Sequence, residues 1–189
     1  MRKETGMQNF GTLRQYLKDN YEKSVFDAAL NDPSPWVYHL HGRNIIQARM
    51  VANSPYQVVL SADGETEQEI DKINIKLLYP ASQAGAAGKR IKTDKKIAAR
   101  GLEPIISPKN RHYIKNKTLF PLMQQREVLF FTLLEGEIIR GVVLAFSRYD
   151  LTVGLKGGIP VMVLRHAVLD VRDKRGRCYL KSHVMRKSG

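Results

Sequence analysis

Residues 128–172 contain short apolar runs that are separated by single turns, and this pattern constrains the fold more than any other feature of the chain. The five runs are residues 128–134, 137–146, 151–155, 159–164 and 168–172. So many strands in so short a stretch form a strongly bent sheet or a small open barrel rather than a broad sandwich. Gly141, inside the longest run, allows the bend that closure requires. We therefore predict a small antiparallel sheet here.

The first part of the chain has the same order of elements. Phe10, Leu13, Leu17 and Tyr21 recur at helical spacing and predict a helix over 9–21, with a second short helix over 25–30. Strands follow over 36–40, 45–51 and 56–60, and the alternating segment 69–77 predicts either one half-buried strand or two short ones. Residues 119–125 predict one or two helical turns directly before the second sheet. The chain is thus expected to be mainly β with short helices.

A faint internal duplication relates these two regions. Residues 40–43 (Leu-His-Gly-Arg) match residues 134–137 (Leu-Glu-Gly-Glu), and Pro55-Tyr56 matches Arg148-Tyr149. We therefore divide the chain into a first domain over 1–80, a flexible linker over 81–118, a second domain over 119–172 and a tail over 173–189. The linker assignment rests on its small residues, its basic character and the interruptions at Pro104 and Pro108.

The charge of the chain is concentrated outside the two predicted domains. The formal net charge is +13, yet residues 1–80 carry nine basic and ten acidic residues, and residues 119–171 carry five of each. The linker has ten basic residues against two acidic ones, and the tail over 172–189 has seven against one. Such basic segments attract phosphate backbones, although a merely solvated surface is the alternative reading of the same residues.

Composition and motifs exclude several functional classes. Cys178 is the only cysteine, so an internal disulfide or a thiolate metal cluster is excluded. No run of about 18 apolar residues predicts a membrane span and no signal peptide begins the chain, so we expect a cytoplasmic location. His39 and His41 lack further ligands for a metal, and Glu135 and Glu137 lie in a turn that we expect to be solvated. We find no catalytic set, and we expect no enzyme activity, metal or cofactor.

Within the second region the sequence resembles the bacterial RNA chaperone Hfq family and, more broadly, Sm-like proteins. The resemblance rests on 134–136 (Leu-Glu-Gly), Gly141, 146–149 (Phe-Ser-Arg-Tyr) and 163–168 (Val-Leu-Arg-His-Ala-Val). It covers residues 119–172 well and residues 9–80 weakly. It implies two tandem Sm-like domains of the SH3-type open-barrel class, each with five bent antiparallel strands, the first domain being degenerate.

The resemblance also implies where RNA binds. Tyr149 matches the residue on which a base stacks, Arg148 the polar residue before it, Arg165 the basic pore residue, and His166 the histidine that contacts the base. In the first domain, Tyr56 and Lys72 occupy the places of the aromatic residue and the histidine, whereas Pro55 and Asp71 replace their polar neighbours. Thr132 stands where the family usually has a tyrosine that stacks adenines, so the resemblance does not extend to that A-rich site.

Two functional hypotheses follow. The first is an Hfq-like RNA chaperone that binds U-rich single-stranded RNA in post-transcriptional regulation. The second is a ring-forming Sm-like scaffold or ribosome-associated factor that binds RNA non-specifically through its basic segments. In both, open sheet edges pair with other copies to form a homo-oligomeric ring of modules, built from three or from six chains. The sequence leaves the number of chains open.

Overall fold

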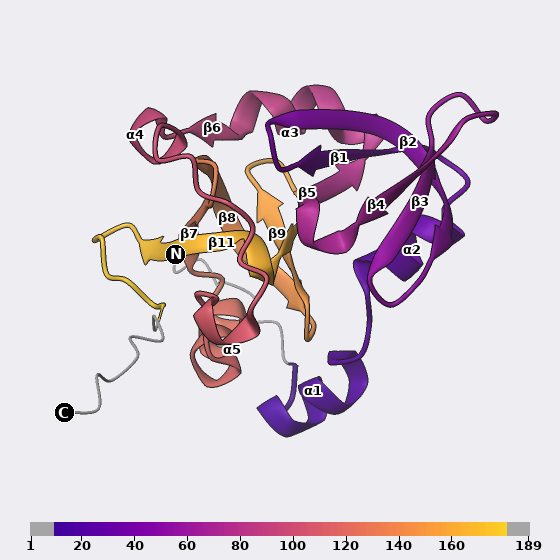
Figure 1. Cartoon of the computed structure of the whole chain (residues 1–189). Coiled ribbons are helices and arrows are strands. Elements are labelled where there is room, and N and C mark those ends of the chain that lie inside the picture. Colours follow the sequence, from indigo (N-terminus) through magenta and orange to yellow (C-terminus); the bar gives the residue numbers. More distant parts are fainter. Residues whose placement is uncertain (1–9, 181–189) are drawn as a thin grey trace.

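The structure, a computed structural model, describes residues 10–180 (Figure 1). Its strands belong to one 11-stranded antiparallel sheet with short helices around it, so the chain is mainly β as predicted. The path through the sheet begins at β11 (Val168–Asp173) and ends at β4 (Glu67–Asp71), which lie on opposite sides of the molecule in Figure 1. The sheet therefore does not close on itself, and β11 and β4 are its terminal strands.

The first half of the chain forms two helices and five strands close to the predicted positions. Thr12 and Ser24 cap the helices, since each side chain accepts a hydrogen bond from a backbone N–H in the first turn. The alternating segment over 69–77 is two strands separated by a 3-10 turn. The elements are α1 (Leu13–Asn20), α2 (Val25–Asn31), β1 (Trp36–Leu40), β2 (Asn44–Asn53), β3 (Gln57–Ser61), β4, η1 (Lys72–Asn74) and β5 (Ile75–Pro80).

The second half repeats this plan. Its elements are α5 (Asn116–Gln124), β7 (Val128–Leu133), β8 (Glu137–Phe146), β9 (Asp150–Leu155), β10 (Ile159–Leu164), η4 (Arg165–Ala167) and β11. In both halves the first four strands form a meander, and the fifth strand returns to pair with the first. Strand β5 also pairs with β10 of the other half. We call residues 25–80 the first unit and residues 116–173 the second unit.

The two units agree in detail. One sequence offset relates the starts of the second strands, Asn44 and Glu137, and the starts of the two 3-10 turns, Lys72 and Arg165. The backbone N–H of Lys72 donates to the Tyr56 carbonyl at 2.8 Å, as that of Arg165 donates to the Tyr149 carbonyl at 2.9 Å. The units are therefore structural repeats of each other.

The repeat corrects part of the predicted duplication. Pro55-Tyr56 and Arg148-Tyr149 are matched as predicted, whereas β1 ends at Leu40 and β7 ends at Leu133 rather than at Leu134. The turn match is thus shifted by one residue. The same offset makes Lys72 equivalent to Arg165, and makes Ile73 rather than Lys72 equivalent to His166.

The segment between the units contains regular elements, which the prediction of a flexible linker did not include. They are η2 (Ala81–Gln83), α3 (Ala84–Arg90), β6 (Lys92–Thr93), α4 (Lys95–Ala98) and η3 (Pro108–Asn110). β6 pairs with the start of β8, Ala87 is fully buried, and the Asp94 carboxylate caps α4. Each element is only a few residues long and depends on contacts with the units, so local sequence carries little signal for it.

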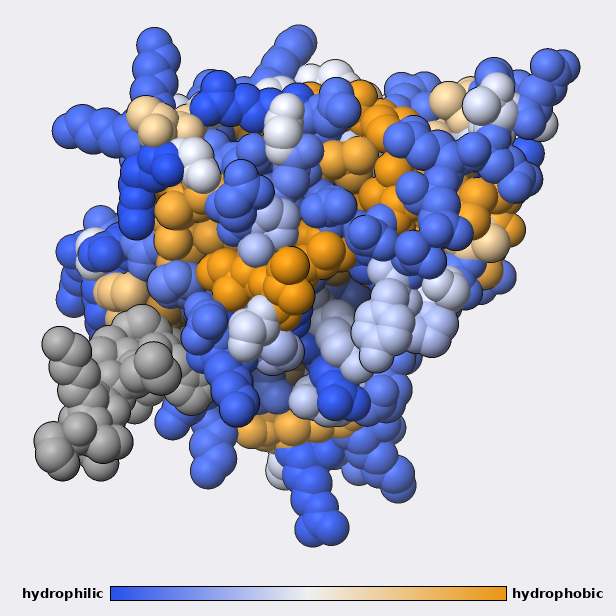
Figure 2. Space-filling view, in the orientation of Figure 1, coloured by the Kyte–Doolittle hydropathy of each residue, from blue (hydrophilic) through white to orange (hydrophobic). Residues whose placement is uncertain are grey.

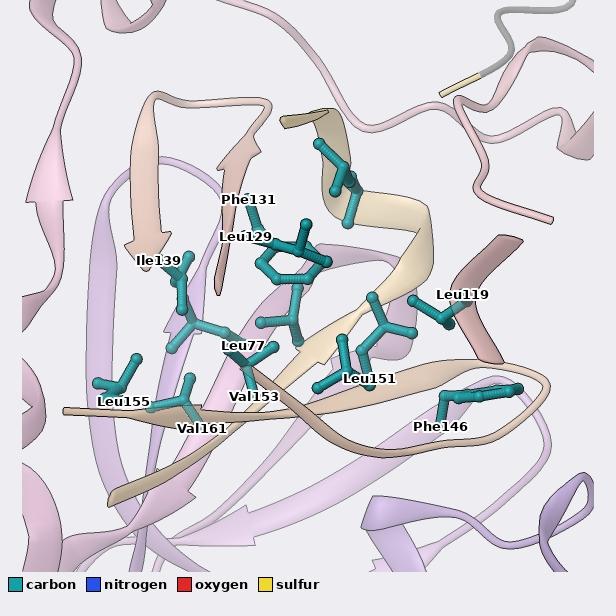
Figure 3. Packing of buried hydrophobic residues seen from close by; sticks show 14 of the residues in the cluster. Leu77, Leu119, Leu129, Phe131, Ile139, Phe146, Leu151, Val153, Leu155 and Val161 are labelled. Carbon is teal, nitrogen blue, oxygen red and sulfur yellow. The ribbon is translucent and has the colours of Figure 1, made fainter. Parts of the chain in front are cut away.

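The two predicted sheets are joined by β5 and β10, which pair antiparallel at Met162 with Leu78 and at Val163 with Leu77. The cores are shared as well. Leu77 of the first unit lies among buried side chains of the second unit (Figure 3), and Leu164 of the second unit packs in the core of the first. The units therefore pack as one continuous structure.

Helix α1 also crosses between the units. Although it precedes the first unit in the chain, it packs against α5 and the end of β8. The Tyr16 hydroxyl donates to the Phe146 carbonyl at 3.1 Å and accepts from the Phe146 N–H at 2.7 Å. The phenol ring is buried beside Phe120 and Phe146. This contact fixes the residues after α1, including Tyr21, beside the turn between β8 and β9.

Candidate nucleic-acid interface

The turn between β8 and β9 holds an aromatic ring out toward solvent. The Ser147 hydroxyl accepts hydrogen bonds from the backbone N–H groups of Tyr149 and Asp150, both at 3.2 Å. This arrangement leaves the Tyr149 side chain 54% exposed, which is unusual for a large aromatic residue. An exposed ring on a rigid turn can stack on a planar group such as a nucleobase.

Arg148 lies between two aromatic rings. Its guanidinium carbon is 5.3 Å from the centre of the Tyr149 ring and 6.0 Å from that of Tyr21. A carboxylate oxygen of Glu22 is 3.9 Å from a guanidinium nitrogen of Arg148. The backbone N–H of Arg148 donates to the Tyr21 carbonyl at 2.8 Å. Because Arg148 and Glu22 are both largely exposed, this ion pair is weak. The Arg148 charge therefore remains accessible to an anion.

A cavity of about 320 Å³ lies beside this pair. Its wall combines α1's end, the segment before α5, and the two turns that carry the predicted arginines. The lining residues are Tyr21, Tyr113, Ile114, Lys115, Asn116, Arg148 and Arg165. Three cationic and two aromatic side chains thus surround one opening. This is the residue chemistry expected of a site for a phosphate with its base.

Arg165 lines the cavity, and other residues of the chain hold its guanidinium in place. Its guanidinium donates to the Ile114 carbonyl at 3.4 Å and to the Asn116 side-chain oxygen at 3.1 Å, and lies 5.5 Å from the centre of the Phe146 ring. Burial lowers the pKa of Arg165 to about 10, while nearby Asp150 acts in the opposite direction. The group is still cationic at neutral pH, and it supplies a fixed positive charge.

His166, by contrast, is not among the described residues that line this cavity. Its Nε2 lies 2.8 Å from the Ile75 carbonyl of the first unit. Burial lowers the pKa of His166 to about 4, so the ring is neutral at pH 7 and Nε2 is the protonated nitrogen that donates. The side chain predicted to contact a base thus contributes to the packing between the units.

The predicted residues of the first unit lie on the equivalent turns. Tyr56 is 83% exposed. The Lys72 ammonium donates to the Ser54 carbonyl and lies 4.8 Å from the centre of the Phe26 ring, so it packs back onto α2. Burial lowers the Lys72 pKa, although Asp27 opposes the shift. The first unit therefore presents an exposed tyrosine whose basic neighbour is turned inward.

Four cavity residues were not predicted from the sequence as site residues: Tyr21, Tyr113, Ile114 and Asn116. They come from segments that are distant in the chain from the β8–β9 turn. Lys115 was counted only as part of the basic linker. No local motif marks these residues, because the fold of α1 and of the segment before α5 onto the second unit creates their neighbourhood.

A second polar cluster lies at the junction of the units, and it corrects the prediction that Glu135 and Glu137 lie in water. Both carboxylates form ion pairs with Lys76 of β5, whose side chain is fully buried. Glu135 also accepts from the Gly42 N–H at 2.9 Å. Burial alone would raise the pKa of Glu135, but Lys76 and the Gly42 N–H outweigh it and lower the pKa. This cluster could not be predicted from the sequence, because its members belong to different units.

A cavity of about 390 Å³ adjoins the cluster and is lined partly by Arg43, Ile45, Tyr79 and Ile91. His39, also in its wall, pairs with the Tyr79 hydroxyl at 3.0 Å. We interpret the cluster as structural, because each charged group that defines it bonds across the junction. Among the residues that the structure describes, no three His, Cys, Asp or Glu side chains are grouped as metal ligands.

Figure 2 shows hydrophilic side chains over most of one face, with hydrophobic areas in the middle of the view and toward its right edge. Within residues 10–180, no helix has the length and apolar character needed to cross a membrane. Comparisons with family models, with curated proteins and with solved structures found no match for this chain.

Proposed function

We propose that this chain is an RNA-binding protein with two tandem Sm-like domains, which acts in the cytoplasm as an Hfq-like chaperone on U-rich single-stranded RNA. The observation that carries the proposal is the exposed Tyr149 ring, held beside Arg148, which lines one cavity together with Arg165. A base stacks on Tyr149, and the two guanidinium groups attract the adjoining phosphates. His166 acts indirectly, by fixing the turn that carries Arg165.

The distribution of charge supports the same proposal. The site contributes only a few cations, whereas ten basic residues lie in 81–118, which passes beside the cavity at residues 113–116. Phosphate contacts of this kind provide affinity without sequence preference, and base stacking adds selectivity. The basic segment therefore concentrates RNA near the Tyr149 site.

The proposal includes assembly into a homo-oligomeric ring of modules. Strands β5 and β10 join two units within the chain, and β4 and β11 are the corresponding strands left at the ends of the sheet. The same pairing between chains would extend the sheet from copy to copy, and closure gives a ring of three or of six chains. Repetition of the Tyr149 site around a ring multiplies a weak contact for one nucleotide.

The alternative is a ring-forming scaffold or ribosome-associated factor that binds RNA non-specifically. The observation that favours it is the inward direction of His166, which leaves Tyr149 without the predicted base-contacting partner. In that case the basic residues of 81–118 provide almost all of the RNA affinity.

RNA binding by Tyr149→Ala and Tyr149→Phe separates the two functions. Affinity is measured against oligo-U and oligo-A over a salt series. Loss of the ring is expected to weaken oligo-U binding about tenfold or more while the salt slope barely changes, because stacking involves no phosphate. Tyr149→Phe keeps the ring and should retain the affinity. Unchanged oligo-U affinity in Tyr149→Ala, with strong loss on substituting Lys92 and Lys95 by Ala, would favour the scaffold.

A further inference from the structure

The outer edge of β11 is covered by the end of the described chain. After a turn at 174–176 the chain reverses and runs along β11, and we call residues 177–180 the C-terminal strap. The Tyr179 N–H donates to the Val171 carbonyl at 2.9 Å, and the Asp173 N–H donates to the Arg177 carbonyl at 3.1 Å. Arg172 and Cys178 form an antiparallel bridge. The strap therefore uses backbone groups that face away from β7.

The strap lies where the repeat would place a neighbouring strand. The junction within the chain uses Leu77 and Leu78 of β5, and the same sequence offset takes these residues to Asp170 and Val171 of β11. The Val171 carbonyl is the group to which Tyr179 donates. The strap therefore bonds to the outer edge of β11, as β10 pairs with β5 within the chain.

The partner that fits this edge is β4 of a second copy. The offset that relates the units takes Met162 and Val163 of β10 to Glu69 and Ile70 of β4. Copying the internal register onto the ends of the sheet therefore places Glu69 opposite Val171, and Ile70 opposite Asp170. Continued in the antiparallel sense, this register directs Glu65 and Glu67 toward the turn after β11.

Charge is complementary in this arrangement. Glu65, Glu67, Glu69 and Asp71 make β4 and its approach acidic, with no basic residue between them. The turn after β11 carries Lys174 and Arg175, and Arg177 begins the C-terminal strap. Opposite charges on two edges favour pairing of β4 with β11 over pairing of either edge with its own copy.

We propose that the C-terminal strap is an autoinhibitory cover, which competes with β4 of a second copy for the outer edge of β11 and so regulates assembly. This inference rests on the ring assembly of the proposed function. The strap is suited to displacement because it holds β11 by one bridge and a few hydrogen bonds, and its Tyr179 and Leu180 are only partly buried against the core. Two side-chain hydrogen bonds add to these. The Cys178 thiol donates to the Asp170 carboxylate at 3.1 Å, and the Tyr179 hydroxyl donates to the Asp173 carboxylate at 3.1 Å.

Releasing the strap should promote association. Tyr179→Pro removes the N–H that bonds to Val171 and leaves the charge of the tail unchanged. Sedimentation velocity over a concentration series should show its association midpoint at a concentration about tenfold lower than that of the unmodified chain, since the lost bond favours the covered state. Tyr179→Phe is the matched control: it keeps the N–H, loses only the hydroxyl, and should shift the midpoint less.

Locking the strap should have the opposite effect. Arg172→Cys places a thiol directly opposite Cys178, the only native cysteine. Opposed residues in an antiparallel bridge have Cα atoms about 4.5 to 5.5 Å apart, within the range of a disulfide. Oxidation of this variant is expected to prevent association, and reduction of the same sample to restore it.

Two results would overturn parts of the proposal in different ways. If the unmodified chain, Tyr179→Pro and oxidised Arg172→Cys all associate equally, assembly stands and the regulatory role of the strap is refuted. If none associates at any concentration, both the strap's role and the ring are refuted, while oligo-U binding still tests RNA recognition separately. Should Tyr179→Pro lose its cooperative unfolding, deletion of residues 178–189 takes its place, with the same expected shift.

Discussion

His39 and His166 are buried histidines whose protonation the fold opposes. Burial lowers the pKa of each to about 4 from an ordinary value of 6.5. In both cases the ring bonds to a group on β5, the Tyr79 hydroxyl or the Ile75 carbonyl. Around His39 the ionisable neighbours are Glu137 and Lys76, and around His166 they are Arg111 and His41. The neutral His39 ring is thus held within the first unit, and the neutral His166 ring is part of the packing between the units.

Stability should therefore fall as the pH is lowered from about 7 toward 4. In this window the unfolded chain binds protons at these histidines while the folded chain does not, so acid favours unfolding. Each histidine is expected to contribute a loss of about 1 to 2 kcal/mol between pH 7 and pH 5. Urea unfolding at a series of pH values measures the slope. His166→Asn should flatten it, and a slope that is identical in this variant would contradict the assignment.

Lys76 is a charge that the fold has removed from water, and its two carboxylate partners lie on the other unit. Lys76→Met is expected to destabilise the protein by about 3 kcal/mol or more, because it leaves Glu135 and Glu137 without a counter-charge. Urea unfolding at pH 7 gives the value. The triple variant that also carries Glu135→Gln and Glu137→Gln should recover much of the loss. If the triple variant is as unstable as Lys76→Met alone, unpaired charge is not the cause.

At the scale of elements, Gly141 is required for the close approach of β8 to β9. A Cβ atom on Gly141 would lie 2.3 Å from the Gly154 carbonyl oxygen, which is backbone and cannot rotate away. Gly141→Ala is expected to cost about 1 to 3 kcal/mol of unfolding free energy. Gly85→Ala is the control, since its Cβ would meet nothing within 4 Å inside α3, and helix propensity should make it neutral or slightly stabilising. Thermal unfolding of the two variants compares them directly.

The strands could be predicted from sequence because their signals are local. Apolar alternation and turn residues located β1, β2, β3 and all five strands of the second unit to within a few residues. The short elements of 81–118 could not be predicted, because β6 exists only where it pairs with β8, and α3 only where Ala87 is buried against the core. The same reason explains the misplacement of Glu135 and Glu137, whose partner Lys76 is far away in the chain.

The residues of the candidate site also divide into those that local motifs predicted and those that only the fold brings together. Arg148, Tyr149 and Arg165 were selected from motifs within the second unit, and the fold brings the two arginines to one cavity. Tyr21 and Tyr113 reach it only because α1 and the segment before α5 pack onto that unit. His166 was placed correctly in the chain, but the direction of its side chain depends on β5 of the first unit, which no local motif contains.

At the scale of the whole molecule, the shared cores couple the two units. Because Leu77 packs in the second unit and Leu164 in the first, neither core is complete alone. The full chain should accordingly unfold in one transition, with intrinsic fluorescence of Trp36 and far-UV circular dichroism giving the same midpoint. Trp36 reports on the first unit, where it is buried. Two separated midpoints would contradict this coupling.

The pairing of β5 with β10 has a consequence for the order in which the chain is synthesised. The strands of the first unit are complete well before β10 is made, so during translation the outer edge of β5 is open to any passing strand. Lys76 lies near the start of that edge strand, and at this stage neither carboxylate partner has been added. A solvated charge there opposes aggregation, as gatekeeper residues do. The residue that forms ion pairs at the finished junction thus protects the nascent chain before the junction exists.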